Sequence, residues 1–133
     1  MIVIRPVLEK VKIARDHIAG IAAQWPVNLY AVRLVASELV THAIRCAETE
    51  EIRADAYTAE DGSENMYVIE VWDADAKAPG IDLCPVCLAP PDERGPWKLT
   101  DHADRWGVHH DDDDGGKVVY AAWIRPCPPS PHR

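Results

Sequence analysis

Apolar and polar residues alternate with a helical period in the first part of the chain. In residues 9–25 the apolar positions stand three or four apart, which predicts a helix with one apolar stripe formed by Val11, Ala14, Ile18, Ile21 and Trp25. Pro26 ends that helix, because proline cannot continue the hydrogen-bond ladder. Asn28 is a favoured N-cap residue, so a second helix is expected over residues 29–47. Its broad apolar face indicates packing against a sheet.

The rest of the sequence has the two-residue period of β-structure. Strands are predicted over residues 2–4, 52–58, 66–73, 106–110 and 117–124. In the strongest of them, Ile69, Val71 and Asp73 share one face, while Val68 and Trp72 point the other way. Alternation therefore puts an acidic side chain on the face that the helices are expected to cover.

The segments between these elements are polar or rich in proline. Residues 60–65 and 111–116 contain glycine among acidic residues and predict turns. Residues 74–96 form a long connection, which in a small domain is typical of a lid or binding loop, and residues 97–105 are expected to form a short helix. The last residues, 126–133, are rich in proline and are expected to be an extended, mobile tail.

Two helices followed by hairpin-connected strands predict the fold class. We expect an α+β two-layer sandwich, with a mostly antiparallel, mixed sheet and helices packed on one face. Residues 1–125 form a single domain in this interpretation, and the length of 133 residues agrees with one domain.

Composition and charge exclude several classes of function. The chain has 14 Lys+Arg against 22 Asp+Glu and a net charge of -8, which argues against nucleic acid and anionic membranes as partners. No apolar run approaches the roughly 20 residues of a membrane span, and the first residues do not resemble a signal peptide. A cytoplasmic location and four reduced cysteines are therefore expected.

The second helix contains one line of polar residues at helical spacing, namely Glu38, Thr41, His42 and Arg45. Spacing alone leaves two interpretations open: a solvated helix face, or the floor of a pocket in which Glu38 acts as a base. Asp73 is a second candidate, because a buried carboxylate needs a partner, and a ligand N–H donor is one possibility. Gly95, just before the expected short helix, is a weaker candidate for phosphate binding through backbone amides.

These features, in this order, resemble the anti-sigma regulatory factors, small histidine-kinase-like ATPases with the Bergerat ATP-binding fold. The resemblance covers nearly the whole domain and is closest to short single-domain members. It is carried by residues 37–43 (SELVTHA), 68–75 (VIEVWDAD), 103–108 (ADRWGV) and 115–120 (GGKVVY). It implies an ATP-binding regulatory protein that acts in transcriptional control through protein–protein contacts.

The resemblance also implies roles for individual residues. Glu38 would be the general base of a serine kinase, and His42 stands where the family has the asparagine that holds Mg²⁺. Asp73 would accept a hydrogen bond from the adenine amino group, with Asp75 in place of a glycine. The remaining nucleotide contacts would come from Gly95 and Thr100.

Two departures from the family pattern bear on activity. A histidine nitrogen at position 42 suits Zn²⁺ better than Mg²⁺, which prefers oxygen ligands. The lid reads Arg94-Gly95-Pro96-Trp97, so a proline removes a backbone donor where phosphates would bind. The sequence therefore leaves two alternatives: an ATP·Mg²⁺-dependent kinase, or a degenerate module that binds a sigma factor or an antagonist protein without productive ATP binding.

A third hypothesis rests on Cys84 and Cys87, a CxxC pair in the long connection. Such a pair could bind zinc if two further ligands completed the site. Finally, the strand at residues 2–4 is an edge that could pair with another chain, and related proteins often dimerise, so a homodimer is possible.

Overall fold

The computed structural model describes residues 1–76 and 102–127. Within these ranges the elements are β1 (Ile2–Ile4), a short 3-10 helix η1 (Leu8–Lys10), α1 (Val11–Ala22), α2 (Leu29–Cys46), β2 (Ile52–Asp61), β3 (Glu64–Asp73), β4 (Arg105–His110) and β5 (Lys117–Pro126). The long connection over 77–101, with most of the expected short helix, lies outside the described residues. None of the helices in the described ranges is long and apolar enough to cross a bilayer.

Both predicted helices are present, and the second matches its predicted bounds most closely. Asn28 caps α2 as expected, because its Oδ1 accepts a hydrogen bond of 3.2 Å from the backbone N–H of Ala31. The first helix ends at Ala22 rather than at Trp25. The chain turns there, with the Trp25 N–H donating to the Ala22 carbonyl, so that the Trp25 ring contacts Tyr67 and Trp123.

The strands form one five-stranded sheet in the order β1-β2-β3-β5-β4. Every pairing among these strands is antiparallel, so the mixed sheet that we expected is not found in the described part of the chain. For β2–β3 and β4–β5 the reason is local, because they are hairpins and a hairpin makes its two strands antiparallel; β1–β2 and β3–β5 pair across longer connections. Gly62, with a φ of 66°, supplies the left-handed residue that the first of these turns requires.

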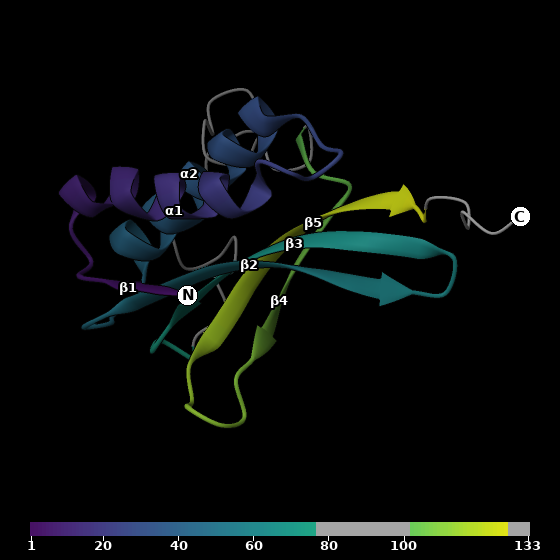
Figure 1. Cartoon of the computed structure of the whole chain (residues 1–133). Helices are drawn as coiled ribbons and strands as arrows, with labels where there is room; N and C mark the ends of the chain where they lie inside the picture. Colours follow the sequence, from purple (N-terminus) through teal and green to yellow (C-terminus); the bar gives the residue numbers. More distant parts are fainter. Residues whose placement is uncertain (77–101, 128–133) are drawn as a thin grey trace, which may run out of the picture.

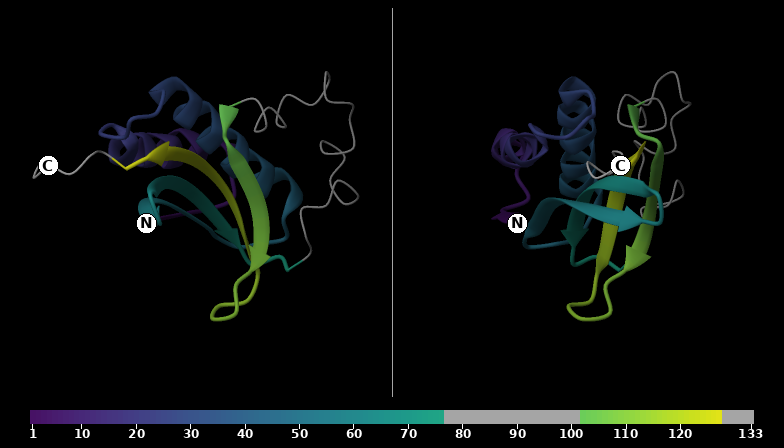
Figure 2. Two further views of the ribbon diagram at one scale, coloured as in Figure 1. Left: turned by 90° about the vertical axis from the view of Figure 1, so that its right-hand side faces the viewer. Right: turned by 45° about the vertical axis from the view of Figure 1, so that its right-hand side comes forward.

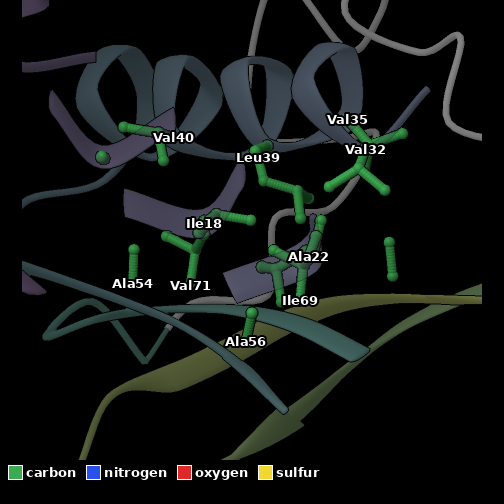
Figure 3. Packing of buried hydrophobic residues seen from close by; sticks show 14 of the residues in the cluster. Ile18, Ala22, Val32, Val35, Leu39, Val40, Ala54, Ala56, Ile69 and Val71 are labelled. Carbon is green, nitrogen blue, oxygen red and sulfur yellow. The ribbon is translucent and has the colours of Figure 1, made fainter. Parts of the chain in front are cut away.

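Both helices cover the same face of the sheet, which makes a two-layer α+β sandwich (Figures 1 and 2). α1 lies above β1 and β2, and α2 crosses β2, β3 and β5. Figure 3 shows the apolar side chains between the layers, with Ile18, Val35 and Leu39 from the helices above Ile69 and Val71 from the sheet. Each Å² of apolar surface that is removed from water contributes about 25 cal/mol, so burial of this kind is the main stabilising contribution to the fold.

The last strand is longer than predicted. β5 continues to Pro126, which pairs with Glu64, and the Cys127 N–H donates to the Ser63 carbonyl at 2.8 Å. Proline is tolerated there because β4 pairs with β5 only as far as Ala122, so the outer side of the strand end needs no donor. The expected mobile tail, residues 126–133, therefore begins inside the strand, and 128–133 lie outside the described residues.

Candidate functional site

A buried ion pair forms at the end of the sheet where β3 leaves and β5 begins. Asp73, the last residue of β3, lies opposite Lys117, the first residue of β5, and both point toward the helices. The Lys117 Nζ lies 2.8 Å from the Asp73 Oδ1, and the two side chains are 4% and 1% exposed. Asp73 thus has the partner that its burial requires, and that partner is a side chain of the same protein.

Neighbouring backbone groups complete this ion pair. The Asp73 Oδ1 also accepts the N–H of Asp75 at 2.9 Å, and the Lys117 Nζ donates to the Asp75 carbonyl at 2.8 Å. The Asp75 carboxylate in turn accepts the N–H of Glu48, while the Thr49 hydroxyl accepts the N–H of Ala74. The chain leaving β3 is therefore fastened both to β5 and to the segment after α2.

Burial and charge act in opposite directions on Asp73. Burial raises the pKa of its carboxyl above the ordinary value, and the hydrogen bond and charge of Lys117 lower that pKa. An ammonium at 2.8 Å in a dry environment is a strong hydrogen-bond partner for the carboxylate. Each of the two buried charged groups therefore has its hydrogen-bond partner within the folded chain.

Gly116 allows this close approach. Its φ is +76°, and a Cβ at this position would collide with the backbone carbonyl oxygen of Asp73. The glycine therefore brings the start of β5 against the end of β3, where Lys117 meets Asp73.

His42 lies on the buried side of α2, close to the ion pair. Its side chain is 7% exposed, so the interpretation of a solvated line does not hold for this residue. Burial, together with the charge of Lys117, lowers the pKa of His42 to about 4. The imidazole is therefore neutral near pH 7, because burial and the nearby ammonium both disfavour its cationic form.

The other members of the polar line on α2 are less buried. Glu38 and Thr41 are half-buried, and Arg45 is exposed. Within one turn of the helix, the side chains pass from buried at His42 to exposed at Arg45. Only part of the predicted line therefore faces the interior.

Beside the ion pair, on the outside of the sheet end, lies a groove of about 480 Å³. It is lined by Glu48, Thr49, Glu50, Glu51, Arg53, Trp72 and Ala74. Three carboxylates therefore line it against one guanidinium, and that guanidinium already lies 2.8 Å from both Glu51 and Asp114. The groove is a poor electrostatic match for a phosphate group.

Several predicted site residues lie outside the described residues: Cys84, Cys87, Gly95 and Thr100. Among the described residues, no group of three or more metal-ligating side chains comes together. Cys46, at the end of α2, is disulfide-bonded, contrary to the expectation of four reduced cysteines. Cys127 is a free thiol.

Sequence reasoning missed Lys117, although a signal was present. Residues 117, 119, 121 and 123 share one face of β5, and the last three are the core residues Val119, Ala121 and Trp123. The same alternation that placed Asp73 on the covered face therefore places Lys117 there too. Two opposite charges on one covered face predict a buried pair once the two strands are known to be neighbours.

Comparisons of the sequence with protein-family models and with curated proteins found no match. The resemblance to anti-sigma regulatory factors therefore rests on the sequence pieces quoted above.

Proposed function

We propose that this chain is a degenerate Bergerat-fold module that regulates transcription by binding a protein, without productive ATP binding or kinase activity. The partner class, a sigma factor or an antagonist protein, comes from the family resemblance. The observation that carries the proposal is the 2.8 Å ion pair between Lys117 and Asp73. If Asp73 is the counterpart of the family's adenine-binding aspartate, its Oδ1 already accepts hydrogen bonds from Lys117 and Asp75 within the chain.

The energetics of the ion pair support this proposal. For an adenine amino group to take the Asp73 Oδ1, it would have to displace the Lys117 ammonium, whose side chain is only 4% exposed. Breaking a buried pair by removing one partner costs roughly 3–5 kcal/mol. A neutral amino donor gains about 1.5–3 kcal/mol from a hydrogen bond to a charged group, so it does not compensate for the loss.

The metal side of the site supports the same conclusion. Mg²⁺ prefers oxygen ligands, and His42 offers a nitrogen that is buried near the Lys117 ammonium. Positive charge at Lys117 disfavours a second cation nearby, just as it disfavours protonation of His42. Phosphoryl transfer depends on metal positioning and electrostatics, so a kinase role is the weaker candidate.

Calorimetric titration with ATP and Mg²⁺ tests the proposal. We expect no binding heat from the natural protein at millimolar nucleotide, and the same result from Asp73→Asn. Micromolar binding that disappears in Asp73→Asn would mean that the aspartate does bind adenine, and the proposal would then be wrong. A double variant, Lys117→Ser with His42→Asn, removes both obstacles, so a gain of Mg²⁺-dependent ATP binding in it is the expected positive result.

The partner half of the proposal needs a separate measurement. Sigma factors and antagonist proteins from the same organism can be titrated against the purified chain, with and without ATP. We expect one of them to bind with an affinity that nucleotide does not change. An affinity that depends on ATP would favour the kinase-type alternative.

A further inference from the structure

The face of the sheet that is turned away from α1 and α2 is left open by the other elements of ranges 1–76 and 102–127 (Figure 1). The strand register places Arg53, Trp72 and Val118 side by side on this outer face. The Arg53 guanidinium lies 4.0 Å from the centre of the Trp72 ring, and Trp72 and Val118 are both buried. The outer face therefore has an aromatic and apolar floor beneath charged side chains.

A pocket of about 200 Å³ lies on this outer face. Trp72 and Val118 contribute its apolar lining, and the rest consists of four carboxylates, one guanidinium and a methionine: Asp55, Glu70, Asp111, Asp114, Arg53 and Met1. Pockets for small molecules usually span about 300–1,000 Å³, so this one is small for a metabolite. It has the size for one long side chain, and its carboxylates favour a cationic one.

Two of these carboxylates oppose each other across the sheet. Asp55 and Glu70 are direct partners in the β2–β3 register, and like charges in this position destabilise a strand pair. The Met1 amino group lies 3.3 Å from Asp55, whereas Glu70 accepts a 3.2 Å hydrogen bond from the neutral Tyr57 hydroxyl and forms no ion pair with another described residue. Burial and the charge of Glu70 raise the pKa of Tyr57 to about 12. A cation between Asp55 and Glu70 would remove the repulsion.

The acidic lining continues beyond the pocket. Arg53 and Trp72 also line the 480 Å³ groove described above, so the two cavities lie on either side of one guanidinium–indole stack. The groove adds three carboxylates, and the single guanidinium is already shared between Glu51 and Asp114. We call the carboxylates of both cavities the outer acidic face: Glu48, Glu50, Glu51, Asp55, Glu70, Asp111 and Asp114.

We propose that the outer acidic face docks a basic, extended segment of the partner protein, with one lysine or arginine side chain in the 200 Å³ pocket. The cation of that side chain would lie between Asp55 and Glu70, and its aliphatic stem would pack against Trp72 and Val118. A second cation of the segment would lie in the groove on the other side of the stack. The inference rests on the proposed function only in taking the partner to be a protein.

Charge complementarity favours this occupant. A surface with seven carboxylates and one guanidinium repels anionic ligands, and the net charge of -8 steers basic partners toward the chain. The described residues contain no group of three or more side chains that could hold a metal ion. An extended peptide can place successive cationic side chains in two neighbouring cavities, and proteins that act on nucleic acid have basic surfaces of the kind required.

Fluorescence anisotropy with a labelled ten-residue peptide tests the proposal. The probe contains four alternating arginine and lysine residues, and the control peptide has glutamine in their place. We expect the full chain to bind the basic peptide and not the control, with an affinity that falls as salt is raised. Absence of binding to the basic peptide would overturn the proposal, and so would equal binding of both peptides.

Matched charge removals locate the contact. Glu70→Gln should raise the peptide dissociation constant by about fivefold, whereas Glu60→Gln makes the same change of charge on the exposed end of β2, outside both cavities, and should leave it unchanged. Asp111→Asn and Asp112→Asn form a second pair within one turn, of which only the first removes a lining carboxylate. Equal weakening by all four variants would mean that only net charge matters, which would overturn the docking site.

Stability separates a binding role of Glu70 from a structural one. Glu70→Gln removes the repulsion with Asp55, so its stability against urea should equal or exceed that of the natural protein while its peptide affinity falls. A loss of stability would mean that Glu70 acts in the fold and would overturn its role in docking.

The same variants distinguish this inference from the proposed function. A sigma factor or antagonist protein that binds Glu70→Gln as tightly as the natural chain would leave the proposed function intact and overturn the docking site. A basic peptide that binds at the pocket, with no such protein binding to the chain, would support the docking site and contradict the proposed partner class.

Discussion

Two ion pairs in this molecule have the same length and opposite surroundings. Lys117 and Asp73 lie 2.8 Å apart between the helices and the sheet, with side chains 4% and 1% exposed. Arg53 and Asp114 are also 2.8 Å apart, but on the outer face, where the side chains are 27% and 56% exposed. The N–O distances of the two pairs are equal, so a difference between their contributions to stability must come from their exposure to solvent.

The difference lies in what each group loses when its partner is removed. Around Arg53, water and salt ions can replace Asp114, so the pair contributes little to stability. Around Asp73 there is no water to replace Lys117, so a lone carboxylate remains in a dry site. The buried pair therefore constrains the fold strongly, although it need not add net stability relative to an apolar pair.

The largest expected effect follows from removing the buried cation. Lys117→Met keeps a side chain of similar length and leaves Asp73 without its ion partner. We expect a loss of about 3–5 kcal/mol in the free energy of unfolding, measured by urea denaturation. In the double variant Lys117→Met with Asp73→Leu, most of that loss should be recovered. A single variant as stable as the natural protein would contradict the importance of burial at this site.

A smaller effect is expected from acid, through His42. Its pKa falls from 6.5 in the unfolded chain to about 4 in the folded one. Between these values the unfolded state binds a proton that the folded state does not, so stability falls as pH is lowered from 6.5 toward 4, by up to about 3 kcal/mol. Urea denaturation across this range should show it.

The variant His42→Gln isolates that contribution, because glutamine does not titrate. Its stability should fall less steeply with decreasing pH than that of the natural protein. His109→Gln, on the exposed edge strand β4, is the control and should leave the slope unchanged. Equal slopes in His42→Gln and the natural protein would mean that the buried imidazole is not the responsive group.

The smallest effect is expected at the exposed pair. Arg53→Met makes the same kind of change as Lys117→Met, but at a residue that also stacks on the Trp72 ring at 4.0 Å. We expect a loss of stability much smaller than that of Lys117→Met, and it should shrink further in high salt. A loss as large as that of Lys117→Met would mean that burial does not explain the difference between the two pairs.

Much of the fold could be predicted from sequence because local signals were strong. The apolar period and Asn28 located α2, and alternation located β3 together with the direction of Asp73. Strand neighbours were not predictable in this way. The placement of β5 between β3 and β4 depends on long-range pairing, and the period of a single strand contains no information about it.

The same distinction between local signals and long-range pairing applies to the candidate site. The sequence by itself determined that Asp73 lies on a covered face and needs a partner, because alternation and the cost of burying a charge are local rules. Only the tertiary structure decided that the partner is Lys117, 44 positions away, and that His42 faces the core near it. The reason is physical: burial and pairing are properties of neighbours in space, and the sheet register that creates those neighbours forms only when the whole chain folds.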